Sequence, residues 1–302
     1  MHQSEQAAIR STLAFYELFG VGRTIDQLAP YVLNARMNRK ALTAALTQQV
    51  ASKTLVQTRG AYAFSRPSAA QTPIAQNWAR SKRKLVEPIT RILASSPFVR
   101  MAALSQSVAM ETAKASSDLD TFVIAEPNRL WTARFLAMAR LKLAGIAKRH
   151  GTTADHGCFG FWIDTNVLDL TSIAIADDIY LAFWIAHLEP LANRDQTYEQ
   201  FVSANQSFLR QFPNWQSRPA PTTIPINGVR LIERCLGGWF GNLLEKFLYR
   251  IQSKKIWRDD IAHRVGASVA ASPTMCKLHH FDKRTELRDR WYQLTQKKKR
   301  RG

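Results

Sequence analysis

The feature that most restricts the fold of this chain is a short alternation of elements between residues 99 and 125. Residues Val99–Leu104 are apolar enough for a buried strand, residues 107–115 predict a short helix, and residues 119–124 predict a second strand. A helix flanked this closely by two strands is typical of α/β and α+β domains. The sequence therefore predicts an α/β (α+β) fold.

Two aspartates, Asp118 and Asp120, mark the start of the second predicted strand. Residues i and i+2 of an extended chain point to the same face, so both carboxylates share one side. Two such anions repel unless a cation lies between them, and Mg²⁺ is commonly bound by one or two carboxylates together with phosphate oxygens. Ser107, at a helix start, can offer its hydroxyl and nearby N–H groups to a phosphate. The pattern favours Mg²⁺-assisted phosphoryl chemistry, and the alternative is a strand end with exposed aspartates.

This order of elements resembles the nucleotidyltransferase superfamily related to DNA polymerase beta, whose signature is an apolar strand, Gly-Ser, a spacer and Asp-x-Asp. Ser107 matches the signature serine, and Asp118 and Asp120 match its paired metal ligands. The chain up to about residue 215 is also similar to bacterial proteins described only as nucleotidyltransferase-domain proteins. The resemblance implies a mixed sheet with flanking helices, and Mg²⁺-dependent transfer of a nucleoside monophosphate from an NTP to an unknown acceptor.

Two positions depart from that signature. Gln106 stands where the signature has Gly, which lets the backbone approach the triphosphate closely and adopt a positive φ. Glu111 stands where related proteins often repeat a Gly, and it is expected to set a negative charge near the phosphate path. The alternative to an active enzyme is therefore a catalytically impaired nucleotidyltransferase fold that acts as a DNA-binding or regulatory protein.

A third carboxylate usually comes from a neighbouring strand in this superfamily. The segment GCFGFWID predicts that strand, with Phe159 and Phe161 on one face and Trp162 on the other. Asp164, at its end, is the first candidate for the third carboxylate, and Asp169 is the second. The alternative for Asp164 is a helix cap.

Three further side chains each allow two interpretations. Arg129 and Arg134, in RLWTARF, are candidates for contact with the triphosphate or a base, and the alternative is a helix surface. His187 lies in an apolar helical stripe, and the preferred interpretation is a packed core histidine rather than a base.

The first 66 residues resemble a winged helix in arrangement. Residues 4–18 predict a helix, Thr24 and Gln27 form a capping-box pattern, and Asn38 can cap a third helix. A hairpin with its turn at Arg59-Gly60 comes after it. The residues expected to touch DNA phosphates are Arg36, Arg39, Lys40, Lys53 and Arg59. The alternative is a winged helix used for protein contacts or dimerisation.

The chain is long enough, at 302 residues, for several domains. We predict a winged-helix-like domain in residues 1–66, followed by a linker and basic helix in residues 67–97, of which the linker is 67–77. A nucleotidyltransferase-like domain is predicted in residues 98–215, and a basic helical region with a disordered tail in residues 216–302. The run ARSKRK in the basic helix is interpreted as a solvated face.

Charge is concentrated at the two ends of the chain, whose formal net charge is +19. Residues 1–100 hold 14 basic and 4 acidic residues, residues 101–215 hold 9 and 12, and residues 216–302 hold 19 and 7. Such a balance draws a protein to polyanions or anionic surfaces, so nucleic acid is an expected partner besides NTP.

The last part of the chain predicts a basic amphipathic helix over residues 229–259, interrupted at Gly237-Gly238. Packing onto the preceding domain is the preferred interpretation, and a membrane-surface role is the alternative. The segment LHHFD, residues 278–282, has a metal-like composition but no known ligand spacing, and is assigned no role. The basic tail, residues 297–301, is predicted to be disordered and to touch nucleic acid.

Three cysteines, Cys158, Cys235 and Cys276, are too few and too scattered for a disulfide framework or a four-ligand zinc site, which favours a reducing compartment. No segment has the composition of a secretory signal or a transmembrane helix. We therefore expect a soluble, cytoplasmic protein, and the sequence leaves its oligomeric state open.

Overall fold

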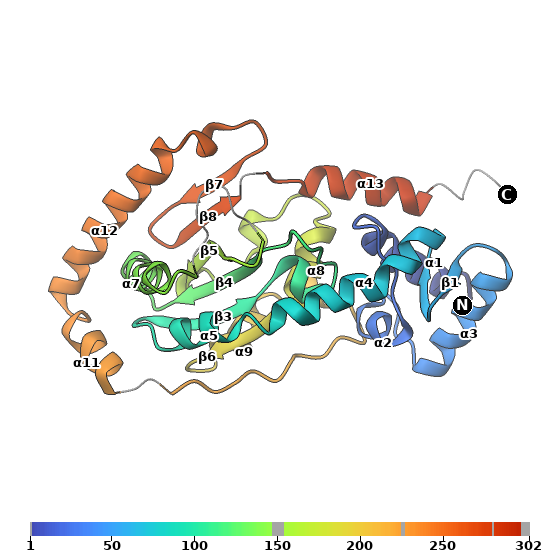
Figure 1. The fold of residues 1–302 in the computed structure, drawn as a ribbon, viewed down its shortest axis with the longest axis horizontal. Coiled ribbons are helices and arrows are strands. Elements are labelled where there is room, and N and C mark those ends of the chain that lie inside the picture. The colour runs from blue at the N-terminus through green and yellow to red at the C-terminus, as the bar shows by residue number, and fades with distance from the viewer. Residues whose placement is uncertain (1, 147–153, 225–226, 280, 297–302) are drawn as a thin grey trace.

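The computed structural model describes residues 2–146, 154–224, 227–279 and 281–296. Its centre is a six-stranded mixed sheet with helices on both faces, and three helices with a small hairpin of their own lie at one end (Figure 1). The described residues thus have the mixed α/β architecture of an α+β protein, as the sequence predicts.

The strands form two sheets. They are β1 (Val56–Thr58), β2 (Ala61–Ala63), β3 (Val99–Leu104), β4 (Leu119–Ala125), β5 (Gly157–Asp164), β6 (Glu189–Asn193), β7 (Ser268–Ala271) and β8 (Met275–His279). The large sheet has the order β6-β3-β4-β5-β8-β7, in which β4 and β5 are parallel and the other neighbours are antiparallel. The predicted strands at 99–104 and 119–124 are therefore confirmed.

Helices make up most of the rest of the fold. They are α1 (His2–Glu17), α2 (Ile25–Leu28), α3 (Arg39–Ala51), α4 (Arg66–Arg83), α5 (Glu87–Ala94), α6 (Gln106–Ala109), α7 (Leu130–Leu143), α8 (Ile179–His187), α9 (Thr197–Ala204), α10 (Gln206–Leu209), α11 (Asn227–Cys235), α12 (Trp239–Arg258) and α13 (Arg284–Gln296). Residues of α1, α8 and α13 pack against one face of the large sheet, and residues of α5, α7 and α12 pack against the other.

A bulge in β5 decides which residues share a face of the sheet. Asp120 pairs with Cys158 but Phe122 pairs with Phe161, so β5 has one extra residue between these pairs. As a result Phe161 packs in the cluster under α8, whereas Phe159 packs in the cluster under α7. The predicted common face for Phe159 and Phe161 is therefore wrong, because strict alternation fails at a bulge.

The N-terminal module, residues 2–63, follows its local sequence signals. Thr24 and Gln27 form the predicted capping box, and the Asn38 side chain accepts a hydrogen bond at the start of α3. Arg59 and Gly60 have φ values of 52° and 78°, as a two-residue hairpin turn with both central residues at positive φ requires. The module has its own apolar core around Leu13 and Leu42.

The same module is joined tightly to the large sheet through α1. The Phe15 ring stacks on Phe183 of α8 with centroids 3.8 Å apart. Arg23, 1% exposed, lies over the Tyr16 ring and donates a hydrogen bond to the backbone oxygen of Met110 in the loop after α6. The N-terminal module and the loop after α6 are thus held in one arrangement.

The predicted linker at 67–77 is wrong, because α4 runs unbroken from Arg66 to Arg83. Its small residues allow close packing rather than flexibility: Ala69, Ala75 and Ala79 are buried. The basic run is not wholly solvated either. The buried Lys82 donates to the backbone oxygens of Ala115 at 3.0 Å and Ser117 at 2.6 Å, directly before the aspartate pair.

The C-terminal region differs from its predicted helical character. It supplies β7 and β8, which extend the large sheet next to β5, so the predicted boundary at residue 216 does not separate the large sheet from the C-terminal region. These short strands have weak local signals, and pairing with β5 determines their conformation. The interruption at Gly237-Gly238 is confirmed between α11 and α12. Residues 297–301 lie outside the described residues.

No helix among the residues that the structure describes is both long and apolar enough to cross a lipid bilayer.

Candidate functional site

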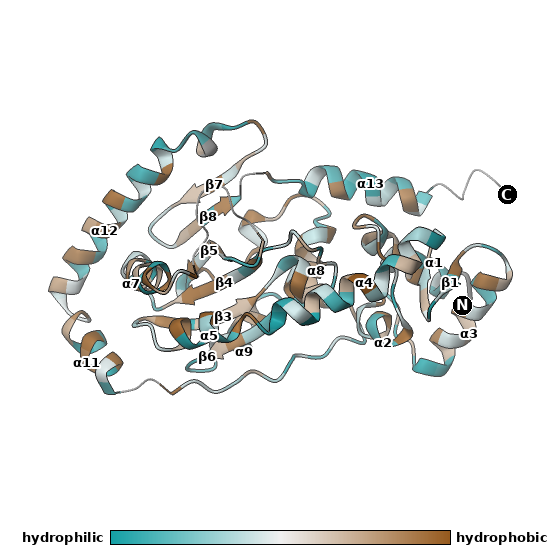
Figure 2. Ribbon diagram, in the orientation of Figure 1, coloured by the Kyte–Doolittle hydropathy of each residue, from teal (hydrophilic) through white to brown (hydrophobic). Residues whose placement is uncertain are grey.

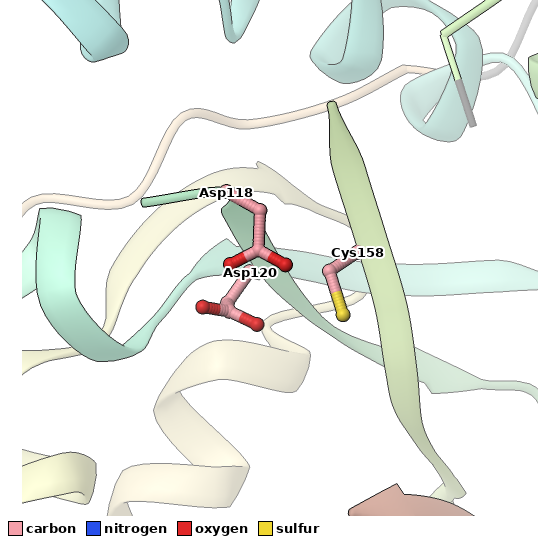
Figure 3. Close-up of side chains that lie close together, drawn as sticks. All are labelled: Asp118, Asp120 and Cys158. Atoms are coloured by element: carbon pink, nitrogen blue, oxygen red, sulfur yellow. The ribbon is translucent and has the colours of Figure 1, made fainter. Parts of the chain in front are cut away.

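The two aspartates lie at the start of β4, Asp118 directly before the strand and Asp120 within it, and neither is exposed. The N–H and hydroxyl of Ser105 donate to the backbone oxygen of Asp120 at 2.9 and 3.2 Å and fix the chain there. Asp118, Asp120 and Cys158 each have a potential ligand atom within 4.8 Å of the others. Figure 3 shows both carboxylates and the thiol on the same side of the sheet.

Cys158 reaches this position through the parallel pairing of β4 and β5, in which it is the partner of Asp120. This register brings the Cys158 thiol beside the carboxylate pair from the adjacent strand. The chain therefore has a thiol where the superfamily resemblance leads one to expect a third carboxylate.

Asp164 lies at the other end of β5, paired with Ala125, and does not join the pair. It is fully buried, and it accepts hydrogen bonds from the Asn128 N–H at 3.1 Å and the Asn166 N–H at 3.0 Å. Burial raises the pKa of Asp164, although these hydrogen bonds act against it. Asp169 is exposed and caps a neighbouring turn. The prediction of either as the third carboxylate is wrong, because both carboxylates serve as backbone caps.

A cavity of about 410 Å³ adjoins the carboxylate pair. Its lining includes Phe19, Gln106, Asp118, Asp120, Cys158, Phe161, Tyr180, Trp184, Lys277, His279, Phe281, Asp282, Lys283 and Arg284. The volume falls within the range of about 300–1,000 Å³ that is usual for small-molecule sites. Burial and the nearby Asp120 charge raise the pKa of Tyr180.

Basic side chains from the C-terminal region line the same cavity. Lys277 is 4% exposed and donates to the Ser268 hydroxyl at 2.9 Å. Its pKa is lowered by burial and by the positive charge of Arg284. Arg284 donates to both carboxylate oxygens of Asp282 and, at 2.8 Å, to Asp178. The cavity thus combines a carboxylate pair with Lys277 and Arg284, both of which already pair with Asp282.

Gln106 begins α6 with a φ of 53°, a conformation in which Gly is favoured. This agrees with the positive φ that the sequence predicts for the signature glycine. Gln106 lines the cavity described above, and with Ser107 and Lys114 it also lines a neighbouring cavity of about 280 Å³. Gln106 therefore borders both cavities.

Glu111 also has a positive φ, 54°, at the second position where the resemblance leads one to expect Gly. Its carboxylate accepts a hydrogen bond from Gln27 and pairs with Arg83 at 3.3 Å. The side chain is therefore directed to the N-terminal module and α4. The Glu111 charge is therefore partly balanced by Arg83, which also pairs with Glu189.

Arg129 and Arg134 do not lie at this site. Arg129 is buried and donates to the backbone oxygens of Leu236 at 3.0 Å and Gly237 at 2.7 Å, at the end of α11. Arg134 donates to the Gln252 side chain of α12 at 2.7 Å. The structure does not bring Arg129 or Arg134 to the carboxylate pair, because both arginines join α7 to the C-terminal helices.

The cations predicted to meet DNA are on the surface of the N-terminal module. Arg36, Lys40, Lys53 and Arg59 are exposed. Arg39 is also exposed but pairs with Asp26. The contacts of these side chains with DNA phosphates therefore stay a prediction.

His187 is buried and contacts the Tyr16 hydroxyl at 3.0 Å, so its interpretation as a packed core histidine is confirmed. Burial lowers its pKa well below the usual value, and it is held away from the cavity.

Sequence reasoning missed Cys158, Lys277, His279 and Arg284 as site residues. The composition of LHHFD was the only local signal for this part of the cavity wall, and no spacing rule connects it to Asp118. Pairing of β8 with β5 brings Lys277 opposite Phe161 and so carries the segment to the site. His280 lies outside the described residues.

Comparison of the chain with models of protein families, with curated proteins and with solved structures gives no match. A functional assignment therefore depends on the sequence pattern and the geometry of the site.

Proposed function

We propose that this chain is a nucleotidyltransferase-like protein that binds an NTP with Mg²⁺ at Asp118 and Asp120 and transfers a nucleoside monophosphate to an acceptor. The observation that carries the proposal is the carboxylate pair at the start of β4, which shares one cavity with Lys277 and Arg284. A metal ion between Asp118 and Asp120 would offset their charge, and a triphosphate bound to that ion would lie beside Lys277 and Arg284, which also pair with Asp282.

The donor atoms fit Mg²⁺ in part. Carboxylate oxygens are hard ligands that Mg²⁺ accepts, and Asp118 and Asp120 would supply them from one face of the strand. The Cys158 thiol is a soft ligand that suits other metals better. Mg²⁺ would therefore have two protein ligands here and would take its remaining ligands from phosphate and water. When bound, the ion would polarise the phosphate and neutralise its developing charge.

The protein's own side chains have separate roles in this proposal. Lys277 and Arg284 would bind phosphate oxygens or orient an acidic acceptor, since their ammonium and guanidinium groups line the cavity. Ser107 would bind a phosphate from the neighbouring cavity, and Gln106 determines whether a triphosphate can extend between the two cavities. The N-terminal module would be a winged helix, and the large sheet a nucleotidyltransferase-like core.

A second candidate function is favoured by Cys158 and Gln106. A site in which the strand partner of Asp120 is Cys158, and in which a long side chain stands at a position suited to Gly, fits a protein that binds a nucleotide without turnover. The exposed cations Arg36, Lys40 and Arg59 would then serve a DNA-binding or regulatory role.

The proposal is tested by incubating the chain with each labelled NTP, Mg²⁺ and the acceptors tRNA, DNA and protein. We expect label transfer by the parent and by Asp164→Asn, and none by Asp120→Asn. Cys158→Asp, which restores a third carboxylate, should raise the rate of transfer. Nucleotide binding without transfer by the parent, together with transfer by Cys158→Asp, would establish the second candidate instead.

A further inference from the structure

Helices α11 and α12 carry a row of large apolar side chains on their outer side. Both helices lie along the edge of the molecule that is farthest from the N-terminal module (Figure 1), and apolar residues alternate with hydrophilic ones along them (Figure 2). Trp239 is 75% exposed and Phe247 is 59% exposed. The apolar stripe, as we call it, consists of Leu231, Ile232, Trp239, Phe240, Leu243, Phe247, Ile251 and Trp257.

This stripe has no role in holding α12 in place, because the opposite side of the helix does so. Leu248 is buried against α7, and the Glu245 carboxylate accepts hydrogen bonds from the N–H groups of Trp131 and Thr132, each at 2.8 Å. Successive members of the stripe, such as Leu243, Phe247 and Ile251, follow the four-residue spacing of one helix face.

The exposed charges beside the stripe are positive up to Arg258, and the exposed Asp259 and Asp260 follow directly. Every basic residue between 227 and 258 is exposed: Arg230, Arg234, Lys246, Arg250, Lys254, Lys255 and Arg258. The two acidic residues of this segment are turned inward. Glu233 pairs with Arg194 at 2.8 Å, and Glu245 binds the start of α7. The outer side of α11 and α12 therefore presents apolar groups and cations.

We propose that this surface binds the face of an anionic lipid bilayer, with the apolar stripe inserted among the acyl chains and the cations at the headgroups. A helix with Trp, Phe and Leu on one side and Lys and Arg beside them is suited to that interface. Charge complementarity excludes the other obvious occupant, a second copy, since pairing two such surfaces would bring like charges together. The aliphatic members, Leu231, Ile232 and Leu243, have no favourable partner on a nucleic acid backbone.

The test is sedimentation of the full chain with vesicles of phosphatidylcholine alone and of phosphatidylcholine with phosphatidylserine. We expect binding to the second kind and little to the first. Each cation near an anionic surface strengthens partitioning about fivefold, so the triple variant Lys246→Gln, Arg250→Gln, Lys254→Gln should weaken it roughly a hundredfold. Its control is Arg36→Gln, Lys40→Gln, Arg59→Gln, which removes the same charge elsewhere and should bind like the parent.

The apolar contribution is tested by Phe240→Ser with Phe247→Ser, which should lose vesicle binding while far-UV circular dichroism stays unchanged. Trp78→Ser with Leu85→Ser, exposed residues on α4 and in the turn after it, is the matched control and should bind normally. Equal binding to both kinds of vesicle, no binding to either, or loss of binding in both charge variants would overturn the proposal. The proposal would also be overturned if sedimentation velocity showed that the parent chain is a dimer and that Phe240→Ser with Phe247→Ser dissociates it.

Discussion

The two ends of the chain carry similar excess positive charge and place it differently. In the N-terminal module, Arg39 pairs with Asp26 on the surface, where their side chains are 65% and 74% exposed. In the C-terminal region, Arg284 pairs with Asp178 where the side chains are 12% and 1% exposed. A count of cations therefore does not identify a partner, whereas the burial of each cation and the groups beside it separate a surface charge from part of a site.

The largest expected difference between the two regions is in stability. Arg284→Met removes one partner from a buried pair and leaves Asp178 charged and buried, so it should lower the free energy of unfolding by about 3–5 kcal/mol. Arg39→Met should lower it by less than about 1 kcal/mol, because water solvates the exposed Asp26. Urea unfolding of both variants measures this. Similar losses of unfolding free energy in the two variants would contradict the distinction between the buried and the exposed ion pair.

Salt dependence tests whether the N-terminal cations meet nucleic acid. If Arg36, Lys40, Lys53 and Arg59 contact DNA phosphates, changing all four to Gln should reduce the slope of log K against log salt by up to about three to four units. The control changes Arg230, Arg234, Lys246 and Lys254 to Gln, which removes the same charge from α11 and α12. Electrophoretic shifts at several salt concentrations give the slopes. An unchanged slope in the first variant would make the module a protein-contact element.

Acid unfolding tests the buried C-terminal charges. Burial alone raises the pKa of Asp282, but the hydrogen bonds from Arg284 outweigh it and hold the pKa well below its usual value. The folded state then binds this proton less readily than the unfolded state, so stability is full above the unfolded pKa and is lost as pH falls below it. As pH falls, the free energy of unfolding should therefore decrease less steeply in Asp282→Asn than in the parent, by up to about 1.4 kcal/mol per pH unit. Denaturant titrations between pH 5 and pH 3 measure it, and an unaltered pH dependence would contradict the assignment.

Local signals explain what the sequence could predict. The capping residues Thr24 and Asn38 and the Arg59-Gly60 turn act over a few positions, and β3 and β4 have apolar patterns that do not depend on distant partners. Asp118 and Asp120 are brought together by strand geometry alone, so the core of the candidate site could also be predicted.

The remaining features depend on tertiary contacts that no local pattern encodes. The bulge in β5 shifts Phe161 relative to Phe159, and the register of β4 with β5 places Cys158, not Asp164, beside Asp120. The small residues of α4 suggest a linker until their packing partners are known. Lys277 reaches the cavity only because β8 pairs with β5.

The smallest expected effect concerns Gln106, which lies between the cavity that holds the C-terminal cations and the cavity of Ser107. Gln106→Gly should remove the side chain that borders both cavities, and so tighten MgNTP binding by about 1–2 kcal/mol. If the Gln amide instead donates to a phosphate oxygen, the same change should weaken binding by a similar amount. Competition titrations against the parent distinguish the two outcomes.

The central claim is that the start of β4 binds an NTP through Mg²⁺. The most direct measurement is calorimetric titration of NTP, with and without Mg²⁺, into the parent, Asp120→Asn and Asp164→Asn. The two variants make the same chemical change on neighbouring strands of one sheet, at opposite ends. We predict Mg²⁺-dependent binding that Asp164→Asn retains and Asp120→Asn weakens by at least about a hundredfold. Undiminished binding by Asp120→Asn, or no binding of any NTP by the parent, would contradict the account.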